Sequence, residues 1–307
     1  MAVPGTAETP LLVVIAGPTA VGKTSVAVRL AGQFQTEIIS ADSRQIYKEM
    51  AIGVARPDEK ELSQARHHIV AYVSVSEPYS AARFESDALE VLERLFRQHS
   101  VVIMAGGSGL YIDAVCKGID FFPDPDPGYR EHLKSILGTK GLEPLRDMLK
   151  EADPAYYRQV DLNNPARIIR ALEVIQVTGR PYSEQRLNQV KKRPFRILKI
   201  ALELPRTELD RRISARTDKM IEQGLIEEVK SLQQFRHLNA LNTVGYKEIF
   251  RYLDGDWSLE QAVEKIKTNT RRYARRQLTW FRRDPEWHWF DAGDFGAVSR
   301  LITESLD

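Results

Sequence analysis

Residues 17–24 read GPTAVGKT, and they directly follow the apolar run LLVVIA at residues 11–16. The spacing is that of a phosphate-binding loop, in which backbone N–H groups and a lysine hold anionic oxygens and a hydroxyl can reach a magnesium ion. The motif does not identify the molecule that carries the phosphate groups. We expect every residue of the loop to contribute to the phosphate site: Gly17, Pro18, Thr19, Ala20, Val21, Gly22, Lys23 and Thr24.

The elements around this loop are those that such a loop requires. Residues 11–16 predict a buried strand, and residues 23–33 continue as an amphipathic helix. Further strands are expected at EIISAD, at VVIMAGG after a helix over residues 80–99, at RILKIALEL and at WHWFDA. Strands that alternate with helices predict a parallel α/β sheet of the P-loop NTPase type, with ligands beyond the carboxyl ends of its strands. Lys23, Asp42 and Ser108 lie at such ends.

The chain changes character near residue 121, where FFPDPDPGY breaks the alternation of strands and helices. Prolines at this density end regular elements, and helical patterns follow up to the turn TGRP. We therefore expect a mainly helical insertion over residues 121–190, between core segments at 11–120 and 191–307. The second core segment contains a long helical region from about Arg206, and residues 1–10 are expected to be loose.

Composition narrows the class of protein. The 307 residues are 43% hydrophobic and 28% charged, as in soluble globular proteins, and the formal net charge is only +2. The single Cys116 excludes an internal disulfide, and no Cys or His group has zinc-ligand spacing. His67 and His68 are adjacent and would not converge on one metal. No run of about 18 apolar residues occurs, so we predict a cytoplasmic protein without a membrane segment.

Two basic spans stand out against this nearly neutral charge. Residues 265–283 contain eight Lys or Arg and no acid, with Tyr273 and Trp280 seven residues apart on one helix face. Residues 186–199 are a second acid-free basic span. Solvated helix faces usually mix acids with bases, so these spans favour contact with a polyanion.

Several chemistries remain open at this point. A GTPase is disfavoured because the chain has no Asn-Lys-x-Asp motif, whereas a small-molecule kinase could use Asp42 as its base. A nucleic-acid-binding module with a regulatory nucleotide site is a third hypothesis. The segment GGSG resembles a nucleophile elbow, but Leu110 occupies the position of the last glycine. The phosphate loop together with basic helices indicates an enzyme that acts on nucleic acid with a small diphosphate donor.

The order of the motifs resembles that of the bacterial tRNA dimethylallyltransferases, also called tRNA isopentenylpyrophosphate transferases. The resemblance runs from residue 11 to residue 289 and rests on the blocks GPTAVGKT, ISADSRQIYKEMAIGVARP, GGSGLYIDA, NNPARIIRALEVIQVTGRP, RISARTDKMIEQGLIEEV, NTVGYKEI and RRYARRQLTWFRR. It implies transfer of a dimethylallyl group from dimethylallyl diphosphate to the exocyclic amine of the tRNA adenosine just 3′ of the anticodon. The basic helical insertion distinguishes this family from prenyltransferases that modify free adenylates.

The resemblance also implies roles for individual residues. Asp42 would accept the proton of the amine, while Lys23, Thr24 and Arg216 would stabilise charge on the departing diphosphate and Thr24 would bind Mg²⁺. The target base must leave the anticodon loop to reach a recessed site. Contacts with the flipped base, the anticodon loop and RNA phosphates are expected from Asp42, Ser43, Arg44, Gln45, Ser108, Arg130, Arg167, Arg170, Tyr246, Lys247, Arg271, Arg275 and Arg276.

Two positions depart from the family pattern. Ala166 stands where many members have a basic or amide side chain, so one RNA contact is expected to be absent. The chain also ends at Asp307 without the zinc-finger extension of eukaryotic members. We therefore expect a bacterial-type enzyme, acting as a monomer and without zinc.

Overall fold

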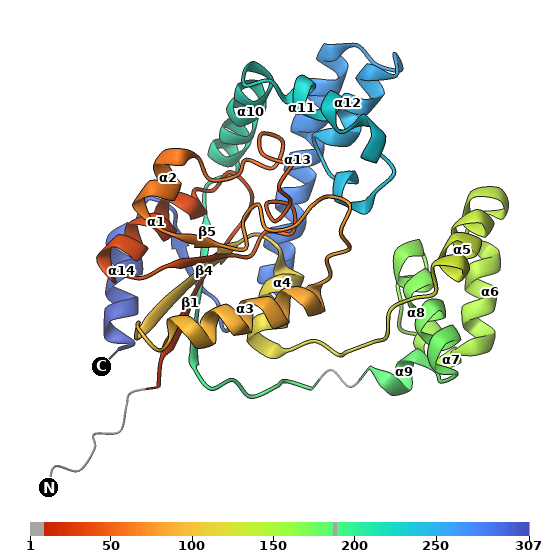
Figure 1. The fold of residues 1–307 in the computed structure, drawn as a ribbon, viewed down its shortest axis with the longest axis horizontal. Coiled ribbons are helices and arrows are strands. Elements are labelled where there is room, and N and C mark those ends of the chain that lie inside the picture. The colour runs from red at the N-terminus through yellow and green to blue at the C-terminus, as the bar shows by residue number, and fades with distance from the viewer. Residues whose placement is uncertain (1–8, 187–188, 307) are drawn as a thin grey trace, which may run out of the picture. The chain divides into compact units, whose positions relative to one another are not determined.

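A six-stranded parallel sheet in the order β3-β2-β4-β1-β5-β6 forms the centre of the larger part of the chain (Figure 1). The computed structural model describes residues 9–186 and 189–306. The strands are β1 (Leu11–Ala16), β2 (Ile38–Ser40), β3 (His67–His68), β4 (Val101–Gly106), β5 (Arg196–Glu203) and β6 (His288–Asp291). The predicted parallel α/β sheet is confirmed, and the two-residue strand β3 is the one strand that the sequence analysis did not anticipate.

The apolar strand sequences are explained by burial on both faces. β1 is buried along its whole length between β4 and β5, with Leu11 opposite Val101 on one side and Arg196 on the other. A parallel strand covered by helices on both sides needs apolar residues at every position, because no face is left for water. This is why LLVVIA reads as a continuous run rather than as an alternating one.

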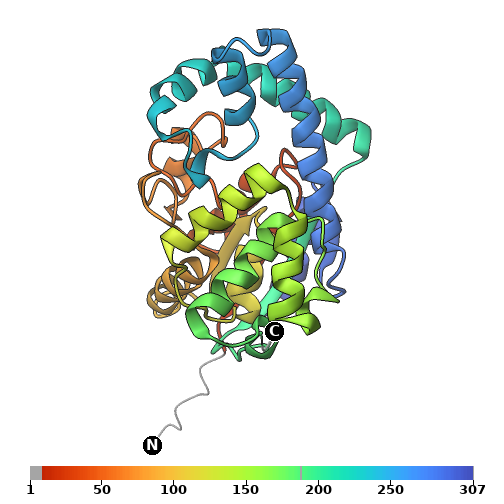
Figure 2. The same cartoon turned by 90° about the vertical axis from the view of Figure 1, so that its right-hand side faces the viewer.

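Outside the sheet, this part of the chain forms helices α1 (Lys23–Gln33), α2 (Glu59–Gln64), α3 (Ala81–Leu95), α4 (Gly109–Lys117), α10 (Arg206–Glu222), α11 (Leu225–Ser231), α12 (Tyr246–Leu253), α13 (Leu259–Phe281) and α14 (Phe295–Glu304). α1 has the bounds that the sequence predicted. The helix expected over residues 80–99 is shorter, because Ser80 caps its N-terminus by accepting a hydrogen bond from the N–H of Arg83 and the helix ends at Leu95. Figure 2 shows α13 as one long helix that runs from α12 to the sheet.

The chain divides into two compact units, one of residues Met1–Cys116 with Lys192–Asp307 and one of residues Lys117–Lys191. The second unit is helical, with α5 (Pro127–Lys140), α6 (Glu143–Ala152), α7 (Pro154–Tyr157), α8 (Pro165–Thr178) and α9 (Tyr182–Gln185). It has its own core, built around Leu133, Leu149 and Ile168. The N–H of Lys191 donates to the carbonyl of Lys117, so the two ends of this unit meet.

Residues at the start of the chain behave differently from the expectation. Residues 1–8 lie outside the described part of the chain, but Thr9 and Pro10 are tied to β5, because their carbonyls accept hydrogen bonds from the side chain and the N–H of Arg196. Within the described residues, no helix is both long enough and apolar enough to cross a bilayer.

Candidate active site

The phosphate loop connects β1 to α1, as its sequence predicts. Gly17 has a φ of +147°, and a Cβ placed there would lie 2.6 Å from the carbonyl oxygen of Leu202. Both the backbone angle and the close approach of β5 therefore require glycine at this position. The loop ends where α1 begins at Lys23, so the helix N-terminus faces the space above the sheet.

Lys23 is the first cation of the site. Its Nζ donates to the carbonyls of Gly17 at 3.0 Å and Pro18 at 2.8 Å. Burial lowers the pKa of Lys23 to about 8, against the attraction of Asp42 and with a further lowering by Arg216. A bound anion would raise the pKa of Lys23 again, because an opposite charge nearby favours the protonated form of lysine.

Arg216 on α10 is the second cation. Its guanidinium donates to the hydroxyl of Thr19 at 3.3 Å and to the carbonyl of Ala55 at 3.5 Å. Burial lowers the pKa of Arg216, and the nearby Asp42 works in the opposite direction. The structure thus brings Arg216 to the phosphate loop although the two lie far apart in sequence.

Asp42 follows β2 and holds its own loop in shape. Its Oδ1 accepts hydrogen bonds from the N–H groups of Arg44 at 2.9 Å and Gln45 at 3.3 Å. Both bonds use the same oxygen, so Oδ2 is the atom that can accept a proton from a ligand. Asp42 can therefore cap its own loop through Oδ1 and still accept a proton through Oδ2.

Two cavities, each of about 290 Å³, meet at Asp42. The first is lined by the phosphate loop with Lys23 and Thr24. The second extends toward Lys247 and the exposed side of α13, and has apolar walls at Ile213 and Met220. The residues common to both cavities are Thr19, Asp42, Val54, Arg216 and Tyr273. An anionic ligand in one cavity and a second ligand in the other would share Asp42.

The other residues predicted beside Asp42 have internal partners. Ser108 accepts a hydrogen bond from the N–H of Ser43 at 2.9 Å and donates to its hydroxyl at 3.1 Å. Arg44 donates to the carbonyls of Asn239 and Ala240, and Gln45 donates to the carbonyl of Ala55 at 2.9 Å. Ser43 and Arg44 line the second cavity, and Gln45 lines the first.

The prediction that Tyr246 contacts RNA is wrong in this structure. Its side chain is fully buried, and its hydroxyl donates to Glu228 at 2.6 Å. The carboxylate of Glu228 also accepts hydrogen bonds from the N–H groups of residues 51–53. Tyr246 therefore helps to hold the loop of residues 51–53 in place. Its neighbour Lys247 is exposed and lines the second cavity.

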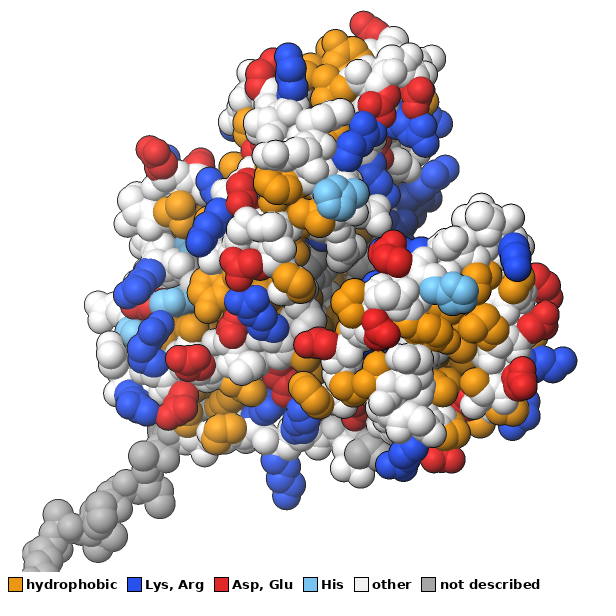
Figure 3. All heavy atoms as spheres, turned by 45° about the vertical axis from the view of Figure 1, so that its right-hand side comes forward, with side chains coloured by type: hydrophobic (Ala, Val, Ile, Leu, Met, Phe, Trp, Pro, Cys, Tyr) orange, Lys and Arg blue, Asp and Glu red, His pale blue; other side chains and the backbone are white. Residues whose placement is uncertain are grey.

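Some of the basic side chains of α13 are bonded within the protein and are less available to RNA than the sequence had implied. Arg271 donates to the hydroxyl of Ser214 at 2.8 Å, and Lys267 lies 2.8 Å from Asp218. Arg275 and Arg276 are exposed, and among the described residues no ion pair joins either to an acid. Figure 3 shows Lys and Arg side chains gathered on the upper part of the surface, where α10–α13 lie.

The second basic span, at residues 186–199, is divided between surface and interior, and residues 187 and 188 lie outside the described part of the chain. Arg186, Lys192 and Arg196 are exposed, whereas Lys199 is buried, so the expectation of a polyanion surface is corrected only for the inner end of the span. Arg193 is buried and pairs with Glu85 at 2.7 Å, and Lys199 is buried with Asp284 at 2.9 Å. Arg196 donates to the carbonyls of Thr9 and Ser305. Acids that are distant in sequence therefore neutralise Arg193 and Lys199, and the sequence of the span does not reveal these pairings.

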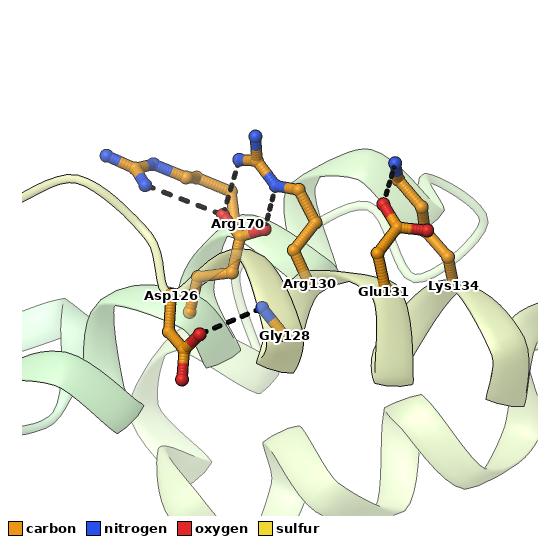
Figure 4. A network of polar contacts seen from close by, with 7 residues as sticks. Asp126, Gly128, Arg130, Glu131, Lys134 and Arg170 are labelled. Atoms are coloured by element: carbon orange, nitrogen blue, oxygen red, sulfur yellow. Dashed lines mark hydrogen bonds and ion pairs between the residues drawn. The ribbon is translucent and has the colours of Figure 1, made fainter. Parts of the chain in front are cut away.

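In the helical unit, a buried carboxylate holds two of the predicted arginines (Figure 4). Arg130 binds Glu173 through two nitrogens, and Nη1 of Arg170 lies 3.5 Å from the same carboxylate. Glu173 has no exposed side-chain surface, while both arginines are partly exposed. Arg167 is exposed on α8.

Sequence reasoning missed Gln277. This buried residue of α13 bonds to the phosphate loop and to the segment after β4. Its position four residues after Tyr273 places both on one helix face, but nothing in the local sequence indicates what that face contacts. Tyr273 was expected on a charged surface, yet it lines both cavities.

No group of three or more His, Cys, Asp or Glu arranged to hold a metal occurs within the described ranges.

A parallel sheet, a strand–loop–helix phosphate site and paired cavities define a P-loop-type α/β protein. The family model described as IPP transferase matches residues 45–284. The chain therefore belongs to the IPP transferase family, and the resemblance drawn from the motifs is confirmed.

Individual relatives agree with this assignment. The chain is 51% identical to tRNA dimethylallyltransferase 1 of Bacteroides thetaiotaomicron over 281 residues, which cover 92% of this chain and 91% of the relative. It is 48% identical to tRNA dimethylallyltransferase 2 of Parabacteroides distasonis over 96% of this chain and 99% of that one. These similarities favour a prenyltransferase over the small-molecule kinase.

Solved structures are also similar. The full-length tRNA isopentenylpyrophosphate transferase from Bacillus halodurans has a TM-score of 0.70 and 36% identity, over 96% of each chain. A eukaryotic dimethylallyltransferase described as acting on tRNA has a TM-score of 0.77 and 27% identity, over 97% of this chain and 79% of that one.

Proposed function

We propose that this chain transfers a dimethylallyl group from dimethylallyl diphosphate to N6 of the adenosine 3′-adjacent to the anticodon, position 37 of tRNA, with release of diphosphate. The observation that supports this most directly is the place of Asp42 where the two cavities meet, with Lys23 and Arg216 close by. One cavity suits an anionic donor and the other an acceptor, and they are adjacent at a carboxylate.

On the donor side, the phosphate loop and two cations would bind the diphosphate. As the C–O bond of the donor breaks, negative charge grows on the leaving diphosphate. Lys23, Arg216 and the N–H groups of the phosphate loop would stabilise that charge. The buried cations have few compensating contacts, so they are prepared for this charge before the reaction begins.

We assign Thr24 as the protein ligand of Mg²⁺. The hydroxyl of Thr24 and the carboxylate of Asp42 line the same cavity, and such oxygens, together with water and phosphate, suit this ion. When bound, the ion would supply further neutralisation of the diphosphate.

On the acceptor side, Asp42 would take the proton. The amine nitrogen forms a bond to the dimethylallyl carbon while the C–O bond breaks, and Oδ2 of Asp42 accepts the proton that the nitrogen loses. Ser43 and Arg44, which line the acceptor cavity, would contact the flipped base, with Gln45 and Ser108 beside them. The bonds between Ser43 and Ser108 and those from Arg44 to Asp42 and from Gln45 to Ala55 would keep this pocket in shape.

Binding of tRNA would use exposed basic residues in both compact units. Lys247, Arg275 and Arg276 are the candidates on the core, and Arg130, Arg167 and Arg170 those on the helical unit. Arg271 would contribute less, because Ser214 already holds it. The substrate is tRNA in this proposal, so we also propose that the chain acts in the cytoplasm, as a monomer.

The decisive experiment offers purified protein and magnesium two labelled donors. Unmodified tRNA is mixed with radiolabelled dimethylallyl diphosphate or with gamma-labelled ATP, and label in RNA is counted. Prenyl label in tRNA, but not in free adenosine monophosphate, is the expected result. Consumption of ATP without prenyl transfer would refute the proposal in favour of a kinase.

The Asp42→Asn variant refines this experiment. It should bind tRNA as the wild type does but turn over at least about 100-fold more slowly, since general-base catalysis typically contributes about 100- to 10,000-fold. Wild-type turnover in this variant would remove Asp42 from the role of base.

A further inference from the structure

Gln277 is a buried amide on α13 whose two ends are bonded to different loops. Its Oε1 accepts a hydrogen bond from the N–H of Thr19 at 2.8 Å, and its Nε2 donates to the carbonyl of Gly107 at 2.9 Å. The side chain is 6% exposed. A buried polar side chain is costly unless both its donor and its acceptor are satisfied, and here both are satisfied by loops beside the cavities.

The two loops follow neighbouring strands of the sheet. Thr19 follows β1 and Gly107 follows β4, and these strands pair along their whole length, from Leu11 opposite Val101 to Ala16 opposite Gly106. A Cβ at Gly107 would lie 2.2 Å from Nε2 of Gln277, so glycine is needed for this approach. The amide therefore bridges the gap that opens where the pairing of β1 and β4 ends.

The bridge is one link in a longer chain of hydrogen bonds. From Thr19 the chain continues to Arg216, whose guanidinium donates to the threonine hydroxyl. From Gly107 it continues through the adjacent Ser108 to Ser43, which is next to Asp42. Gln277 thus connects the side of the site that carries the cations with the side that carries the carboxylate.

α13 also lines the acceptor cavity. Tyr273, one turn before Gln277, and Arg276 both line the second cavity. Trp280, one turn further along, donates from its indole N–H to Asp113 at 2.9 Å and fixes this end of the helix. A ligand that presses on Tyr273 and Arg276 moves the same rigid segment that holds the N–H of Thr19.

We propose that Gln277 is a positioning residue that couples occupation of the acceptor cavity to the geometry of the phosphate loop. The inference rests on the proposed function and deepens it: tRNA on α13 alters how tightly the loop holds diphosphate, and Gln277 carries that effect. Gln277 lines the first cavity, but both ends of its amide are already bonded to Thr19 and Gly107, so we assign its effect to the position of these loops.

The test measures this coupling with inorganic diphosphate as the probe. Its affinity for the holoenzyme with magnesium is determined by calorimetry with and without saturating unmodified tRNA. In the wild type we expect tRNA to change the affinity at least threefold. In Gln277→Met, which keeps the size of the side chain but loses both bonds, the ratio should approach one. Turnover should fall about 100-fold, as expected for reacting groups misplaced by about 1 Å, and tRNA affinity should stay within twofold.

Two further variants separate positioning from packing. Thr279→Val changes an exposed residue of the same helix and should leave both the coupling and turnover at wild-type values. Gln277→Glu keeps the acceptor for Thr19 and regains a donor for Gly107 only when its carboxyl is protonated. Its turnover relative to wild type should therefore rise as the pH falls.

The outcomes are distinguishable from failure of the proposed function. Wild-type coupling and turnover in Gln277→Met would overturn the inference, as would a lowered melting temperature with unchanged coupling. A wild-type enzyme whose diphosphate affinity ignores tRNA would overturn it too. Absence of prenyl transfer by the wild type would instead refute the proposed function, because diphosphate binding is measured without any transfer.

Discussion

Two lysines with little exposed surface, one at the start of α1 and one in β5, have opposite surroundings. Lys23 follows β1 and donates to backbone carbonyls, whereas Lys199 in β5 is bonded to Asp284 and Glu286. Burial lowers the pKa of Lys23 to about 8, despite the attraction of Asp42. Burial also acts on Lys199, but the bonds to Glu286 and Asp284 outweigh it and leave that pKa raised. A lysine already neutralised by carboxylates serves the fold, and one that is not is prepared for an anion.

The largest effect should follow loss of the phosphate-loop lysine. Lys23→Met removes a cation that stabilises the leaving diphosphate, so prenyl transfer to tRNA should fall by about 100- to 1,000-fold in kcat. The stability should not fall, because the substitution removes a buried charge that no bonded carboxylate balances among the described residues. Transfer assays and urea unfolding of the same preparation test both statements. Loss of stability with normal turnover would mean that Lys23 serves the fold and not the binding of diphosphate.

The same substitution at Lys199 should lower the stability of the protein and leave its turnover unchanged. Lys199→Met removes the ammonium that is bonded to the largely buried Asp284, so the free energy of unfolding should fall by about 3 kcal/mol, at the lower end of the range for broken buried pairs because Glu286 is 71% exposed. Turnover per folded molecule should be unchanged. Adding Asp284→Asn should recover part of the stability, and no recovery would mean that the charge pair is not the cause.

The free energy of unfolding measured over a series of pH values should depend on the two lysines in opposite directions. The pKa of Lys23 falls from 10.5 to about 8 on folding, so between these values the unfolded state binds more protons and Lys23 makes stability rise with pH. The pKa of Lys199 is raised, so its contribution is fully present below 10.5 and is lost as the pH rises through its folded pKa.

The same titration should appear in ligand binding. Diphosphate requires protonated Lys23, so its affinity should fall by up to about tenfold per pH unit above the free-enzyme pKa of about 8. Calorimetry from pH 7 to 10 measures this slope, and Lys23→Arg, which stays charged, should flatten it. An equally steep decline in that variant would assign the slope to another group.

The smallest effect extends the comparison to the surface of α13. All three arginines are exposed, but Arg282 is paired with Glu203 at 3.1 Å, whereas no ion pair among the described residues joins Arg275 or Arg276 to an acid. Replacing Arg275 and Arg276 with Ala should weaken tRNA binding and reduce its salt slope by roughly 0.7–0.9 per lost phosphate contact. Arg282→Ala should leave the slope unchanged. If the wild type and both variants have the same salt slope of tRNA binding, Arg275 and Arg276 do not contact RNA phosphates.

The sequence was most informative where short-range chemistry decides the structure. β1, the phosphate loop and α1 follow from a buried apolar run, a Gly-rich turn and a helical pattern within residues 11–33, and this part of the fold is confirmed. The family assignment, also confirmed, depended on the order of such local blocks. The strand β3 escaped notice because its two residues are too short for any period to be seen.

Partners that are distant along the chain could not be foreseen. The bond from Thr19 to Gln277 spans 258 positions, and the pair of Arg193 with Glu85 spans 108. Tyr246 reads as a polar aromatic residue beside Lys247, yet the burial of its ring against the loop of residues 51–53 depends on packing that no local pattern encodes. A basic span therefore indicates an RNA surface only once the acids folded against it are known.

The meeting of Lys117 and Lys191 has a consequence for how this enzyme could diversify. Because the helical unit leaves and rejoins the chain at one hydrogen-bonded point, it resembles an inserted cassette with adjoining ends. Such a cassette can be lengthened, trimmed or exchanged through a single junction, while β1, β2 and α10 keep Lys23, Asp42 and Arg216 at their mutual spacing. The RNA contacts proposed for the helical unit can then change during evolution while the reacting site stays the same.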